Sequence, residues 1–67
     1  MDIRISVGNK IKDFRKKQDL SQDKLAKLSG LDRTYINSVE NGRRNISIVN
    51  LEKIAIALKV KITKIFE

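Results

Sequence analysis

The sequence contains no cysteine, no histidine and no proline, and it has only three glycines among its 67 residues. The missing cysteine and histidine exclude disulfides, thiol or imidazole catalysis and the usual zinc ligand sets. The eight acidic residues are scattered and mostly lie near lysine, and so short a chain has little volume for a catalytic cleft. We therefore expect neither an enzyme nor a protein with a cofactor or metal.

Long apolar runs are also missing. No stretch approaches the roughly 20 apolar residues that a membrane-spanning helix needs. The opening residues, MDIRISVGNK, alternate charged and apolar side chains, unlike a secretory signal. These absences predict a cytoplasmic protein that does not associate with a membrane.

Positive charge is abundant. Fifteen lysines and arginines against eight acidic residues give a formal net charge of +7 and a pI near 10.1. This balance favours a polyanionic partner, of which nucleic acid is the commonest, although lysine-rich helix faces can also serve solubility alone. The length predicts one domain, which would bury only about 60% of its unfolded surface.

Helical periodicity runs through the chain. Ile3, Val7, Ile11 and Phe14 follow a spacing of four, four and three, and Leu25 and Leu28 continue the apolar pattern. Ser, Asp and Gly stand where helices would begin and end. We predict an all-α fold of five helices, at residues 2–17, 22–29, 33–41, 48–58 and 63–66, with N-caps at Ser21, Asp32 and Ser47 and terminating glycines at Gly30 and Gly42.

The second and third predicted helices meet in a short turn that contains Gly30. Two short helices joined in this way form the helix-turn-helix arrangement, here at about residues 21–41. Many small helical bundles contain such a corner, so the corner alone does not indicate DNA binding. The residues on the third helix must indicate whether it binds DNA.

The polar face of the third predicted helix is unusual. With about 100° per residue, five side chains share that face, and Ile36, Val39 and Glu40 fall opposite. Arginine and asparagine suit guanine and adenine edges in a major groove, whereas a solvated face would more often show Glu and Lys. The candidate base contacts are Arg33, Thr34, Asn37 and Ser38, with Asn41 at the helix end and Tyr35 on the flank, where it could also pack at the corner.

Phosphate contacts are expected beside this helix. The N-terminus of the second helix attracts an anion through its free N–H groups and its dipole. A basic loop follows the third helix. The candidate phosphate contacts are Ser21, Gln22, Arg43, Arg44 and Asn45.

The stretch SQDKLAKLSGLDRTYINSVENG resembles the phage repressor and Cro type of helix-turn-helix, the XRE family. The likeness extends from IKDFR to LEKIAIALKV, and LDRTYINSVENGRRNIS is particularly similar to controller proteins of restriction–modification systems. The resemblance implies a lambda repressor-like fold, a DNA-backbone contact at Gln22, base recognition at Arg33, Thr34, Asn37 and Ser38, and a structural salt bridge between Arg15 and Glu40.

The resemblance also implies twofold dimers whose recognition helices lie about 34 Å apart on one side of double-stranded DNA. The expected dimer surface consists of Val60, Ile62, Ile65 and Phe66, although Ile62 and Phe66 could instead close the core. We expect no small-molecule ligand, since 67 residues leave no room for a sensing domain.

The main hypothesis is therefore a sequence-specific DNA-binding transcriptional regulator that acts as a homodimer. A second hypothesis is an antitoxin-type module that neutralises a partner protein and regulates its own operon, which would need a tail to wrap the toxin. A third is a non-specific nucleic-acid-binding domain, which would not need a base reader such as Arg33.

Overall fold

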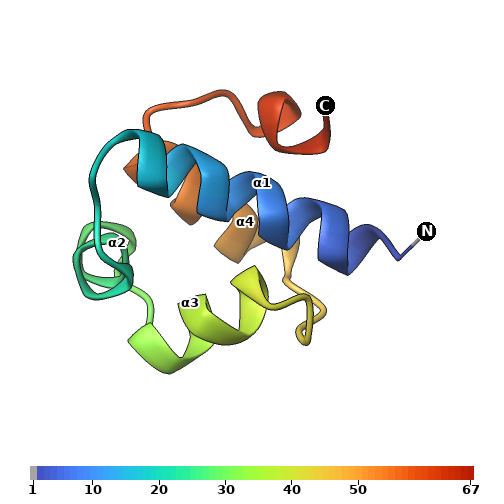
Figure 1. Cartoon of the computed structure of the whole chain (residues 1–67), viewed down its shortest axis with the longest axis horizontal. Helices are drawn as coiled ribbons and strands as arrows, with labels where there is room; N and C mark the ends of the chain where they lie inside the picture. Colours follow the sequence, from blue (N-terminus) through green and yellow to red (C-terminus); the bar gives the residue numbers. More distant parts are fainter. Residues whose placement is uncertain (1) are drawn as a thin grey trace.

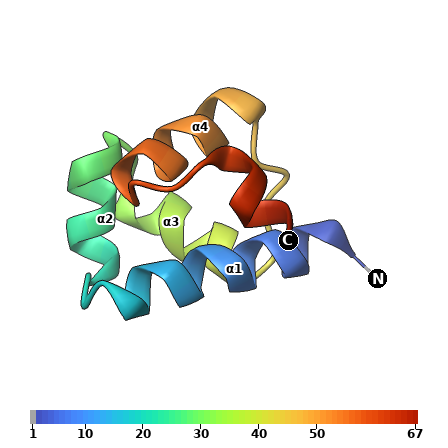
Figure 2. The ribbon, with the colours of Figure 1, turned by 90° about the horizontal axis from the view of Figure 1, so that it is seen from above.

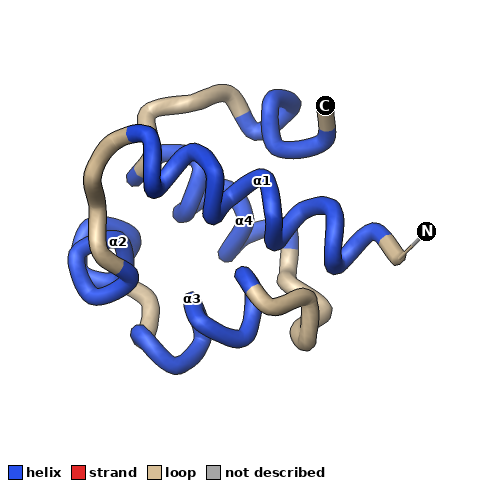
Figure 3. Tube along the Cα trace, viewed as in Figure 1, coloured by secondary structure: helices blue, strands red, loops and turns tan. Residues whose placement is uncertain are grey.

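The computed structural model describes residues 2–67, and within them every regular element is helical (Figures 1 and 3). The α-helices are α1 (Ile3–Lys17), α2 (Gln22–Ser29), α3 (Arg33–Glu40) and α4 (Ile48–Ala57). The last element, η1 (Ile62–Phe66), is a 3₁₀-helix. The prediction of an all-α fold is confirmed, while that of five helices is corrected to four α-helices and one 3₁₀-helix over these residues.

Side-chain caps start three of the helices. Ser21 Oγ accepts a hydrogen bond from Lys24 N at 3.0 Å, and Ser47 Oγ accepts one from Asn50 N at 3.1 Å. Asp2 caps α1, and hydrogen bonds from the Arg4 side chain and backbone lower the pKa of Asp2 to about 2, so this cap stays ionised. Asp32 stands at the N-cap of α3 but makes no side-chain cap bond, unlike the N-caps of α1, α2 and α4.

The core draws on every element. Its fully buried large side chains are Ile11, Leu25, Ile36, Ile54, Leu58 and Ile65. Two predicted core residues are instead exposed: Ile3 at 63% and Leu28 at 51%. Both lie about 100° from the centre of the buried face of their helix, so the helical rotation turns them out of the core.

α3 lies on the opposite side of the molecule from η1 (Figure 1). η1 packs against both α1 and α4, and Figure 2 shows it between them. Gly8 lets α1 approach α3 closely, because a Cβ atom at this position would lie only 2.2 Å from the carbonyl oxygen of Val39. None of the helices in the described chain has the length and apolar character needed to cross a membrane.

A buried ion pair joins α1 to the end of α3. Arg15 Nε donates to Glu40 Oε2 at 2.7 Å and Arg15 Nη2 donates to Glu40 Oε1 at 3.0 Å. The two side chains are only 10% and 1% exposed. Arg15 Nη1 also donates to the carbonyl of Leu20 at 2.6 Å, which fixes the turn that leads into α2. One guanidinium therefore connects α1, the α1–α2 turn and α3.

We predict that Arg15→Met lowers the free energy of unfolding by about 3–5 kcal/mol, because it leaves the Glu40 carboxylate buried without its cation. The double variant Arg15→Met/Glu40→Leu should be more stable than the single variant, since no unpaired charge remains. Urea unfolding monitored by circular dichroism measures both.

The matched control is Lys27→Met, which breaks the solvent-exposed ion pair of Lys27 with Asp23 and should change stability little. If Arg15→Met were no more destabilising than Lys27→Met, the buried pair would not organise the fold.

Candidate nucleic-acid interface

The corner between α2 and α3 is built by three residues, Gly30, Leu31 and Asp32. Gly30 adopts φ of 73°, a left-handed conformation that costs glycine little. This conformation lets Leu31 N donate back to the carbonyl of Ala26 at 3.0 Å and ends α2. The chain then turns directly into α3, whose Ile36 and Val39 are buried. The corner thus presents the polar side of α3 to solvent.

The first two turns of α3 bring several candidate base contacts together. Arg33, Thr34 and Asn37 are exposed, and Ser38 is half-buried. Arg33, Thr34 and Asn37 line an open hollow together with Gln22 from the start of α2. A guanidinium, a hydroxyl and two amides therefore surround one depression, a set of groups suited to base edges and phosphates.

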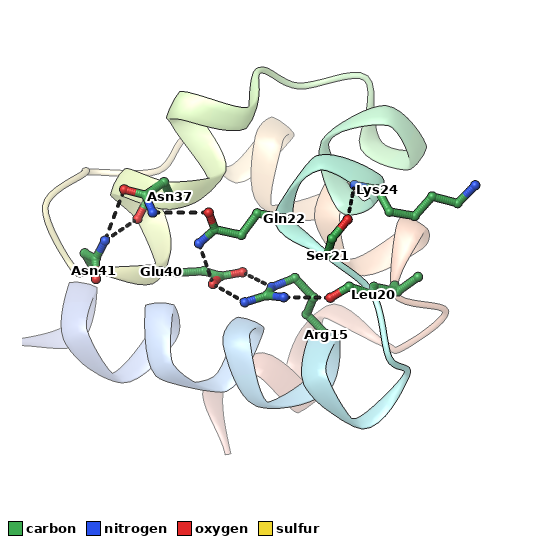
Figure 4. A network of polar contacts seen from close by, with 8 residues as sticks. All are labelled: Arg15, Leu20, Ser21, Gln22, Lys24, Asn37, Glu40 and Asn41. Atoms are coloured by element: carbon green, nitrogen blue, oxygen red, sulfur yellow. Dashed lines mark hydrogen bonds and ion pairs between the residues drawn. The ribbon is translucent and has the colours of Figure 1, made fainter.

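The N-terminus of α2 has its side chains already engaged in the free protein. Ser21 Oγ accepts the cap bond from Lys24 N, and Gln22 Nε2 donates to Glu40 Oε1 at 3.1 Å (Figure 4). Gln22 Oε1 accepts from Asn37 Nδ2 at 3.1 Å. Residue spacing in the sequence does not indicate these links. The Gln22 side chain thus points across α3, while the first backbone N–H groups of α2 have no partner within the helix.

The basic loop after α3 is anchored at its start. Gly42 adopts φ of 71° and lies against Ile5 of α1, and Arg43 N donates to the carbonyl of Ser38 at 3.0 Å. Arg43, Arg44 and Asn45 are exposed beyond this anchor. Two exposed arginines therefore follow the C-terminal end of α3 in the chain.

Tyr35 lies on the flank of α3 and not in the hollow. Its hydroxyl accepts a hydrogen bond from Asn50 Nδ2 of α4 at 3.2 Å, and the guanidinium carbon of Arg44 lies 4.9 Å from the ring centroid. Such a cation–π contact stabilises the position of the loop. Tyr35 therefore links α3, the basic loop and α4. Asn50 carried no sequence signal for this role.

The predicted apolar surface of the C-terminal segment needs one correction. Ile65 is only 1% exposed, because η1 turns this side chain into the core between α1 and α4. Val60 and Ile62 are half-buried against the core, whereas Phe66 is 53% exposed. Of the four residues, Phe66 is the one that presents most of its side chain to solvent.

Phe66 belongs to a larger apolar groove that the sequence analysis did not identify. The groove is formed where the start of α1, the start of α4 and η1 meet, and its apolar lining is Ile3, Val7, Ile46, Ile48, Leu51 and Phe66. The sequence pattern placed Ile3 on the apolar face of the first helix, and it gave Ile48 no role beyond the start of the fourth helix.

Comparison with known proteins agrees with this geometry. A model of the helix-turn-helix family HTH_3 matches residues 11–65. Control protein C.MunI of Mycoplasma sp is 53% identical over 66 residues, which are 97% of this chain and 89% of that protein.

Two solved structures have the same fold. The restriction–modification controller protein C.AhdI from Aeromonas hydrophila superposes with a TM-score of 0.95 and 41% identity, covering 98% of this chain and all of that one. The biofilm regulator SinR, solved in complex with DNA, superposes with a TM-score of 0.86 and 32% identity, covering 91% of this chain and 98% of that one. The α2–α3 corner, the fold and the family match agree. The protein belongs to the helix-turn-helix family of transcriptional regulators.

Proposed function

We propose that this protein is a sequence-specific regulator of the restriction–modification controller kind, which binds double-stranded DNA as a homodimer in the cytoplasm. One observation is central to the proposal: Arg33, Thr34 and Asn37 are exposed around one hollow at the start of α3. A major groove about 12 Å wide admits an α-helix with such side chains. The likeness to C.MunI and C.AhdI supports the controller assignment.

In this proposal the start of α3 enters the major groove. Arg33 donates bidentately to a guanine, and Thr34, Asn37 and Ser38 contact neighbouring base edges. Tyr35 reaches the DNA only at the margin, since its ring packs against Arg44. Phosphates are held on the two flanks of α3. On one flank they contact the first backbone N–H groups of α2, near Ser21 and Gln22, and on the other they contact the side chains of Arg43, Arg44 and Asn45.

The two kinds of contact predict different mutational effects. Arg33→Ala should weaken the free energy of operator binding by about 1–3 kcal/mol, through the contact with one base pair of each half-site, and relax specificity at that base pair. Arg43→Ala should weaken binding to all sequences alike. It should also lower the number of counterions released on binding, read from the salt dependence of the affinity, by about one. Fluorescence anisotropy with operator and random duplexes, at several salt concentrations, measures both variants.

Each of these variants serves as the control for the other, because both remove one exposed arginine. Equal loss of operator and random binding in Arg33→Ala would contradict base readout by this residue.

The apolar groove is the proposed contact with the second copy. Ile48 is 74% exposed and Ile3 is 63% exposed, and both line the groove, which gives a large apolar area for one side of so small a molecule. The molecule measures 29 × 22 × 21 Å, a size compatible with two abutting copies whose α3 helices lie about 34 Å apart, the spacing of successive major grooves. Phe66 joins this contact, whereas Ile65 does not.

We predict that the protein sediments as a dimer at micromolar concentration and that Ile48→Glu converts it to a monomer, because a carboxylate would be buried without a partner. Ile56→Glu is the matched control. Ile56 is 69% exposed on the same helix but lies outside the groove, so this variant should remain dimeric. A wild-type monomer that binds DNA without cooperativity, or a dimeric Ile48→Glu, would refute the interface.

A further inference from the structure

A chain of hydrogen bonds runs from the interior of the protein to the DNA-facing side of α3 (Figure 4). It begins with the buried pair of Arg15 and Glu40 and continues from Glu40 Oε1 to Gln22 Nε2. Gln22 Oε1 then accepts from Asn37 Nδ2, and Asn37 Oδ1 accepts from Asn41 Nδ2 at 3.2 Å. We name the amide portion of this chain, Gln22, Asn37 and Asn41, the amide relay.

The direction of the relay follows from the chemistry of its first member. An ionised carboxylate only accepts hydrogen bonds, and the Glu40 side chain is 1% exposed and held by two bonds from Arg15. The amide of Gln22 must therefore turn its NH₂ group toward Glu40 and its oxygen toward Asn37. An amide oxygen accepts hydrogen bonds, and the donor end of the Asn37 amide is its NH₂ group. Asn37 must therefore turn its NH₂ group toward Gln22, so the buried charge determines which way the Asn37 amide faces.

Orientation matters at Asn37 because an asparagine amide has one donor end and one acceptor end. The torsion that exchanges the two ends is broad in a free side chain, and Asn37 is exposed. The relay uses one N–H and one lone pair of this amide, and it leaves one N–H and one lone pair for a base. An adenine edge presents one acceptor and one donor, so it distinguishes a fixed amide from its flipped form.

We propose that Gln22 is a positioning residue for base recognition: it transmits the polarity of the buried Glu40 carboxylate to Asn37 and so fixes which base pair Asn37 prefers. This inference rests on the proposed DNA-binding function. The Gln22 side chain then has a role other than phosphate binding. The phosphate contact comes instead from the backbone N–H groups at the start of α2.

The first test is a double-mutant cycle of Gln22→Met and Asn37→Ala, read as the relative affinity for the four base pairs at each operator position. Asn37→Ala identifies the base pair that Asn37 reads. Gln22→Met should lower the preference at that base pair about tenfold and leave the preference at the Arg33 base pair unchanged. In the Asn37→Ala background, Gln22→Met should cause no further change in preference.

Lys24→Met provides the control, since it places the same apolar side chain at an exposed position of α2. It should reduce affinity for all sequences alike and leave every base preference intact. If Gln22→Met behaved like Lys24→Met, or if its effect persisted in the Asn37→Ala background, Gln22 would be a phosphate contact and the positioning role would be wrong.

The second test uses the free protein and needs no DNA. Steady-state ¹⁵N{¹H} NOE values of the Asn37 side-chain amide report its mobility on the picosecond-to-nanosecond timescale. We expect a rigid amide in the wild type and a mobile one in Gln22→Met, with the fold unchanged by circular dichroism. Equal mobility in both proteins would overturn the relay.

The two tests separate the possible failures. A wild-type protein without sequence-specific DNA binding would overturn the proposed function, and the positioning role with it. Specific binding combined with an unchanged base preference in Gln22→Met would overturn the positioning role alone.

Discussion

The guanidinium of Arg15 and the carboxylate of Glu40 meet where α1, the α1–α2 turn and α3 converge, and the geometry of the side proposed to face DNA depends on this contact. The pair is buried, so both charges have lost most of their hydration and hold each other in one arrangement. The same guanidinium binds the carbonyl of Leu20, which leads into α2. A single interior interaction thereby sets the position of α3 and of the start of α2, the two parts that the proposed function brings to DNA.

The short helix α3 performs two tasks with its two sides. Ile36 and Val39 bury its apolar side against the core, and Gly8 of α1 allows the close approach. The other side holds Arg33, Thr34 and Asn37 around the hollow. Because packing fixes the first side, the polar side chains start from a rigid backbone, and binding would need to order fewer groups.

The positions of the helices were predictable because their signals are local: Ser21 and Ser47 cap, Gly30 ends α2, and apolar residues recur at helical spacing. Non-local features were not. The exposure of Leu28, the burial of Ile65 and the groove at Ile48 depend on how helices pack. Tyr35 with Asn50, and Gln22 with Asn37, join residues 15 apart in the sequence, and such contacts follow from the crossing of helices, which periodicity does not specify. The family resemblance supplied the pairing of Arg15 with Glu40.

The proposed function requires the α2–α3 corner to read a DNA sequence from a twofold dimer. Selection of bound duplexes from a random pool by the full chain measures this property. We expect enrichment of two inverted half-sites whose centres lie about one helical turn, roughly 10 base pairs, apart on one side of the duplex. A pool that remains random, or one that converges on a single unrepeated half-site, would show that the protein does not read DNA as a twofold dimer.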